Sequence, residues 1–176
     1  MNQTISISLS SLDSKENVEI SWIKHNLAFD IPTLTKKIKD RWFNLRLSFN
    51  LNNSYHKEFT NWVEWFFEKC ESLGADQVIF RELYSSGEWE IDDWIKENKF
   101  DDALLRKIKR HIVKNGRVLW RLPFWQMLYS VNWKISTLID DNSMNSKWLT
   151  AVQKFSILRP DWKLYSHWDD KGSLIF

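Results

Sequence analysis

The chain has 176 residues, which is the length of one domain with at most a small appendage. Its 43% hydrophobic and 27% charged residues exclude an intrinsically disordered chain, because it can bury enough apolar surface to offset the entropy of ordering. A single cysteine excludes an internal disulfide, a paired-cysteine zinc site and a cysteine-ligated iron–sulfur cluster, and no apolar run is long enough to span a membrane. We therefore expect a cytoplasmic globular protein with no metal site and no cofactor.

Three predicted strands lie in the first half of the chain. Residues 5–10 and 45–51 alternate strictly between apolar and polar side chains, and residues 77–83 form a third, more apolar strand. The polar faces of these strands are formed by Ser6, Ser8 and Ser10, by Arg46, Ser48 and Asn50, and by Gln77 and Arg81. A ligand that lies on this side of the sheet would meet these side chains.

Helices are predicted between these strands. A helix over residues 13–26 begins at a capping Asp13 or Ser14, and a second opens at Ile31-Pro32, with Leu34, Ile38 and Trp42 on one face. The clearest helix carries an apolar stripe at steps of three and four, formed by Phe59, Trp62, Val63, Phe66, Phe67, Cys70 and Leu73, and ends at a left-handed Gly74. Cys70 lies on this stripe, which predicts a buried structural thiol.

Strands that alternate with helices form βαβ units and hence a parallel sheet. A polar face on parallel strands suits the lumen of a full or partial βα barrel, where ligands are held inside. We therefore predict an α/β protein whose residues 1–85 form a partial parallel βα half-barrel (βαβαβ).

Residues 86–176 have a different pattern. Helices are predicted over residues 91–100 and 103–114, followed by short strands over 117–123, 124–131 and 133–139. Helical turns over 146–155 and terminal β structure over 157–158, 162–168 and 173–176 complete the pattern. We predict helices and a C-terminal antiparallel β meander that pack on the half-barrel. Eight of the twelve tryptophans follow residue 85, so this region seals the barrel or supplies aromatic anchors for a partner.

Several segments resemble the radical SAM enzymes. TISISLSSLDSKE is similar to the fourth strand of that family's barrel, and LRLSFNLNN is similar to the fifth. FTNWVEWFFEKCESLGADQVIFRELY resembles the fifth helix and the sixth strand. ILRPDWKLYSHWDDKGSLIF is similar to the C-terminal β segment of some bacterial and phage members. The resemblance covers about residues 3–85 and 155–176.

The resemblance implies a truncated relative without the family's chemistry. Radical SAM enzymes hold a [4Fe–4S] cluster with a CxxxCxxC motif, whereas this chain contains only Cys70, and one thiolate cannot hold such a cluster. Polar residues at the end of the family's fourth strand contact the SAM ribose. The residues that correspond to them or lie near them are Ser8, Ser10, Ser48, Asn50 and Arg81. They are either the remnant of a nucleoside site or a polar face that meets solvent.

Charge is separated into two adjacent blocks. Residues 82–102 carry eight acidic and two basic side chains, whereas residues 103–121 carry seven basic side chains and no acidic one. The two blocks are either solvated faces that attract one another or binding surfaces. The predicted partner-binding residues are Lys107, Arg110, Lys114, Arg117 and Arg121. Aromatic residues among bases also occur in nucleic-acid sites, but the alternation places Trp120 with Val118 on one face, as in an ordinary half-buried strand.

These observations favour a non-catalytic interaction protein with no catalytic residues. Its partner would be another protein or a nucleoprotein complex, and one concrete form is a phage or mobile-element inhibitor of a host defence nuclease, of the anti-CRISPR type. The alternative is a SAM- or nucleoside-binding remnant, or one half of a split radical SAM enzyme. Direct nucleic-acid binding is a third, less favoured function. The sheet edges that an incomplete barrel exposes must be covered by the chain's own C-terminal strands, by a second copy or by a partner, so a homodimer is one alternative.

Overall fold

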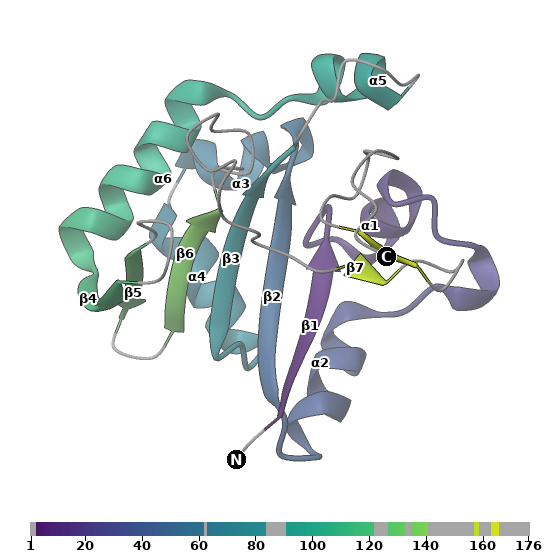
Figure 1. The fold of residues 1–176 in the computed structure, drawn as a ribbon, viewed down its shortest axis with the longest axis horizontal. Helices are drawn as coiled ribbons and strands as arrows, with labels where there is room; N and C mark the ends of the chain where they lie inside the picture. The colour runs from purple at the N-terminus through teal and green to yellow at the C-terminus, as the bar shows by residue number, and fades with distance from the viewer. Residues whose placement is uncertain are drawn as a thin grey trace.

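The computed structural model describes residues 3–61, 63–83, 91–121, 127–132, 135–140, 157–158 and 163–165. Six strands form one sheet in the order β1-β2-β3-β6-β5-β4 (Figure 1). The parallel strands are β1 (Thr4–Leu9), β2 (Asn44–Leu51), β3 (Gln77–Glu82) and β6 (Ile135–Asp140). The antiparallel strands are β4 (Arg117–Arg121) and β5 (Met127–Val131).

The predicted βαβαβ arrangement and the antiparallel meander are both present. β1, β2 and β3 lie side by side in parallel, and β4, β5 and β6 follow one another as antiparallel neighbours. The meander does not form a separate layer, because β6 pairs in parallel with β3 and so continues the same sheet. The chain from β3 to β6 is therefore one long connection between two neighbouring parallel strands.

The helices supply the core on one face of the sheet. They are α1 (Ser14–Ile20), α2 (Ile31–Lys39), α3 (His56–Asn61), α4 (Val63–Ser72), α5 (Ile91–Asn98) and α6 (Asp102–Asn115), with 3-10 turns η1 (His25–Leu27) and η2 (Asn53–Tyr55). In Figure 1 α4 lies behind the sheet and α6 runs along its β4–β6 side. Their inward residues pack against the buried positions of the strands.

An aromatic cluster forms the centre of this core. Phe49 of β2 lies 4.8 Å from Phe66 of α4 between ring centroids, and 6.1 Å from Phe80 of β3. Phe59 of α3 lies 4.4 Å from Phe66, and all four rings are fully buried. The predicted apolar stripe is thus the core stripe, although Trp62 lies outside the described residues. Cys70 is also fully buried, as predicted, and burial raises the pKa of its thiol well above the ordinary value.

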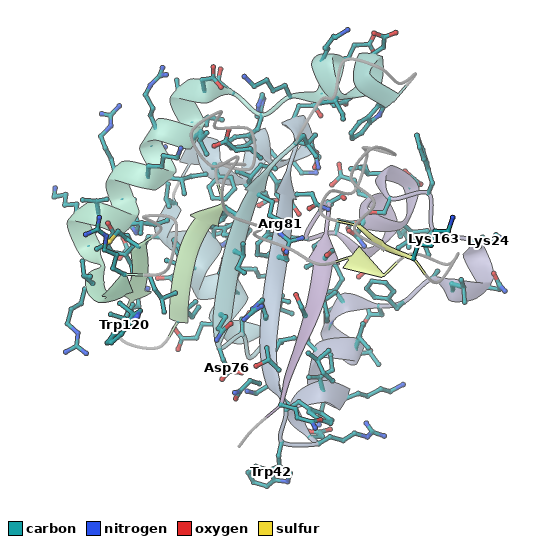
Figure 2. All side chains as sticks on the ribbon, viewed as in Figure 1. Lys24, Trp42, Asp76, Arg81, Trp120 and Lys163 are labelled. Carbon is teal, nitrogen blue, oxygen red and sulfur yellow. The ribbon has the colours of Figure 1, made fainter. Side chains whose placement is uncertain are left out.

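Two of the predicted helices end earlier than expected. The first begins at the N-cap Asp13, whose side chain accepts from the backbone of Lys15 and Glu16, but it ends at Ile20 rather than near residue 26. The second begins at the N-cap Asp30 and ends at Lys39. Trp42 therefore does not share its apolar face: it has a φ of 62° and is 87% exposed, and Figure 2 shows it projecting from the end of the molecule. The prediction for Trp42 was wrong because the helix ends at Lys39, three residues before it.

The C-terminal predictions are only partly covered by the described residues. β7 (Ile157–Leu158) and β8 (Leu164–Tyr165) form an antiparallel pair, in agreement with predicted terminal β structure. The segments over 146–155 and 173–176 lie outside the described residues. Within the part of the chain that is described, no helix is both long enough and apolar enough to cross a membrane.

Candidate functional site

The face of the sheet opposite the helices carries polar residues in rows. The register joins Ser6, Arg46, Gln77, Ser136, Ser130 and Arg117 into one row that crosses all six strands. Within this row Arg46 Nε donates to Gln77 Oε1 at 2.7 Å. Because cross-strand partners point to the same side of a sheet, this row lies on one face, which also carries Ile79 beside Ser48. We call this side the open face.

Four of the five predicted nucleoside-site residues share the open face. Ser8 and Ser48 are register partners, and Asn50 and Arg81 are partners one row further toward the carboxyl ends of the strands. Arg81 is exposed and lies over the middle of the sheet in Figure 2. Ser48 is fully buried, and its hydroxyl has no hydrogen-bond partner among the described residues.

The fifth predicted residue, Ser10, has a structural role. It lies just beyond β1 and is buried, its backbone N–H donates to Asn17 Oδ1 at 2.7 Å, and its hydroxyl accepts from Ser21 at 3.1 Å. Its carbonyl accepts from Asn52 Nδ2 at 2.8 Å and from the Ser54 hydroxyl at 3.0 Å. Ser10 thus joins the ends of β1 and β2. Asn17 and Asn52 are the central residues of this network, and neither was predicted from the sequence.

A groove between α1, α2 and α4 offers few groups to a ligand. It has a volume of about 830 Å³, and its lining includes Asp13, Asp30, Phe29 and Leu73. Both carboxylates already accept backbone N–H groups as helix N-caps, and these hydrogen bonds contribute to the lowered pKa of each. These two acidic groups of the groove are therefore used by the fold, whereas Glu19, which also lines it, is exposed.

The basic surface is built on α6. Asp101 caps the helix by accepting from Ala103 N at 2.7 Å and Leu104 N at 2.9 Å, and these bonds lower the pKa of its carboxyl. Leu105, Ile108 and Ile112 form the buried stripe, so Arg110 and Lys114 project outward and are exposed. Neither of these two bases forms an ion pair with a described residue.

Lys107 differs from the other predicted partner-binding residues. Its Nζ donates at 3.0 Å to the carbonyl of Phe59, near the end of α3. The side chain thereby satisfies a helix-terminal carbonyl and ties α6 to α3. A substitution of Lys107 would change the fold as well as the surface, so Arg110 and Lys114 are the cleaner positions at which to test binding.

β4 is exposed along its whole length. All five of its residues are exposed, and Val118, Leu119 and Trp120 are 50%, 39% and 68% exposed. The register shifts between Val118 and Trp120, so that Arg117 pairs with Ser130 and Trp120 with Leu128. This β-bulge places Trp120 on the open face with Arg117, and Val118 on the helix side with Arg121. The prediction of a half-buried strand with Val118 and Trp120 on one face was therefore wrong.

Apolar and basic side chains are concentrated together between residues 110 and 121. Of the eight exposed large hydrophobic residues among those described, four lie between residues 113 and 120: Val113, Val118, Leu119 and Trp120. Arg110, Lys114, Arg117 and Arg121 surround them in sequence. We call these eight residues, from the outer side of α6 and from β4, the α6–β4 surface. Figure 2 shows Trp120 at the edge of the molecule, away from Arg81.

Comparisons with known proteins identify no relative: no family model, no curated protein and no solved structure matches the chain. Among the described residues there is also no group of three or more His, Cys, Asp or Glu side chains that could hold a metal ion. The geometry of this chain therefore carries the functional argument by itself.

Proposed function

We propose that this chain is a non-catalytic interaction protein that binds a partner through the α6–β4 surface. The observation that supports this most directly is the exposure of Val118, Leu119 and Trp120 in a strand at the sheet edge. Contiguous exposed apolar residues bordered by polar ones are typical of protein interaction sites. Aromatic and arginine side chains are also the residues that most often dominate binding energy at interfaces.

The remaining chemistry of the chain agrees with a binding role. Cys70 is the single thiol, and its burial and raised pKa keep it protonated and out of reach of a substrate. We regard the chain as a degenerate radical-SAM-like protein that has kept a fold for its surface rather than for catalysis.

An inhibitor of a host defence nuclease, made by a phage or mobile element in the manner of an anti-CRISPR protein, is one concrete form of this proposal. In that form the basic α6–β4 surface would bind an acidic face of the nuclease or of its nucleoprotein complex. Addition of the purified chain to the nuclease would then lower cleavage in proportion to the amount of complex formed.

Charge reversal on the α6–β4 surface tests the proposal. We expect the Arg110→Glu, Lys114→Glu, Arg117→Glu variant to retain less than about a tenth of the partner recovered with the unaltered chain, since each reversal replaces attraction with repulsion. Affinity purification from the native host, quantified by mass spectrometry, measures this. Lys15→Glu, Lys24→Glu, Lys37→Glu is the matched control, because it makes the same charge change at exposed lysines elsewhere. Equal recovery with both variants, or no stoichiometric partner, would contradict the proposal.

A nucleoside-binding remnant, alone or as half of a split radical SAM enzyme, is a second candidate. It is favoured by the shared open face of Ser8, Ser48, Asn50 and Arg81, and by the buried Ser48 hydroxyl that lacks a partner among the described residues. We expect calorimetry to detect SAM or S-adenosylhomocysteine binding that Arg81→Ala weakens by about tenfold or more, since a hydrogen bond to a charged group contributes about 1.5–3 kcal/mol. Lys24→Ala, at another exposed base, should leave binding unchanged. No heat at millimolar ligand would discard the single-chain form.

A further inference from the structure

In the part of the chain that the structure describes, the outer side of β4 is a sheet edge. β4 is the last strand in the sheet order, and within the described part of the chain it pairs with β5 alone. Protected edges carry charged or bulged central residues that discourage further pairing. β4 has a bulge at Leu119, which is one such protection, but its three central residues carry no charge and are apolar and exposed. The edge therefore lacks the charge that would oppose an added strand, and an added strand would have to accommodate the bulge.

The basic residues at both ends of β4 determine which kind of strand can pair with it. Arg117 and Arg121 flank the apolar centre, and Arg110 and Lys114 of α6 increase the positive charge nearby. If two copies of β4 paired in antiparallel register about Leu119, Arg117 of each copy would lie opposite Arg121 of the other. Like charges directly opposite one another destabilise a sheet, so a second copy is a poor occupant.

A nucleic acid is also less suited to this edge than a peptide. Single-stranded nucleic acid binds on aromatic platforms to which bases stack, and Trp120 is the single aromatic residue of β4. The exposed side chains of Val118 and Leu119 offer no stacking surface, whereas they match the apolar side chains of an added strand.

We propose that β4 accepts an extended segment of a partner protein as an added strand, and that this segment has an apolar centre and acidic residues at both ends. The inference rests on the proposed function and names the partner's recognition element. Main-chain hydrogen bonds would provide affinity, the apolar centre would cover Val118, Leu119 and Trp120, and the acidic ends would meet the flanking arginines. An acidic end that lies on the open face would approach Arg117, and one on the helix side would approach Arg121.

Synthetic peptides and the full chain test this. The first peptide has a valine-rich centre with glutamates at both ends, the second has lysines in place of the glutamates, and the third keeps the glutamates but has a central proline. We expect the first to bind about tenfold or more tightly than the second by fluorescence anisotropy, because two favourable charge pairs replace two unfavourable ones. The third should bind at least about tenfold more weakly than the first, because proline cannot donate to a ladder. Binding of the first peptide should slow hydrogen exchange at the β4 amides.

Two protein variants make the result specific to β4. Arg117→Glu, Arg121→Glu should reverse the preference so that the lysine-flanked peptide binds more tightly, and Lys15→Glu, Lys24→Glu should leave the preference unchanged. Equal binding of all three peptides, tighter binding of a single-stranded oligonucleotide, or a dimer that excludes the peptide would each overturn strand addition. If the chain does not discriminate among the peptides while charge reversal on the α6–β4 surface still abolishes recovery of a partner, strand addition is wrong and the proposed function stands. If the peptides discriminate but no partner is recovered from the host, the proposed function fails.

Discussion

Replacement of Phe49 by alanine is expected to lower the free energy of unfolding by about 3–5 kcal/mol, the usual cost of truncating a fully buried phenylalanine. Phe49 is fully buried in the second strand of the sheet and contacts the rings of Tyr55, Phe66 and Phe80. The substitution removes the apolar surface of the ring and leaves a cavity among side chains that hold one another in place. Urea unfolding followed by circular dichroism measures the change.

Trp65→Ala is the matched control for Phe49→Ala. Trp65 is also a large aromatic residue and lies in α4, but it is 44% exposed, and alanine favours a helix. We expect its effect to be below about 1 kcal/mol. A Phe49→Ala variant that unfolds at the same urea concentration as the unaltered chain would show that the aromatic cluster is not the centre of the core.

The Asn52→Leu variant is expected to lose about 2–4 kcal/mol of unfolding free energy, because it removes three hydrogen bonds between a buried side chain and the backbone. Asn52 is 2% exposed, and its Nδ2 donates to the carbonyls of Ser10 at 2.8 Å and Asn50 at 3.0 Å. Its Oδ1 accepts from Ser54 N at 2.9 Å. Leucine has a similar size but neither accepts nor donates. Urea unfolding measures the loss.

The neighbouring residue provides the control for Asn52→Leu. Asn53 has the same side chain but is exposed. Asn53→Leu should change the unfolding free energy by no more than about 0.5 kcal/mol, as for most surface substitutions. Similar effects at both positions would contradict the assignment of Asn52 as the residue that joins the ends of β1 and β2.

The periodicity of apolar residues predicted individual helices and strands, because each of these depends only on its own segment of the chain. The alternation of residues 45–51 and the stripe from Phe59 to Leu73 identified the strand and the helix that supply the aromatic cluster. Pairing between distant strands has no comparable signal in a single sequence. The sequence therefore did not predict that β3 pairs in parallel with β6. It also did not predict that strands from residues 1–85 and from residues 86–176 form one sheet.

The candidate surface was predicted in composition but not in geometry. The run of bases identified Arg110 and Lys114 as exposed residues, because they lie opposite the buried stripe of α6. Strict alternation misplaced Trp120, since the bulge adds a residue that is visible only in the register with β5. Asn17 and Asn52 were missed because an asparagine in a turn has the same sequence signal whether its side chain is buried or solvated.

The connection from β3 to β6 contains residues that the fold requires and residues that the fold does not require. Leu105, Ile108 and Ile112 of α6 must continue to fill the core beneath the sheet. Arg110 and Lys114 on the same helix, and the exposed residues of β4, meet no such requirement. Because β1, β2, β3 and β6 pair with one another without β4, substitutions in this outer layer would leave the pairing of the parallel strands unchanged. If the proposed function holds, homologues of this chain will differ more at the α6–β4 surface than in the core of the sheet.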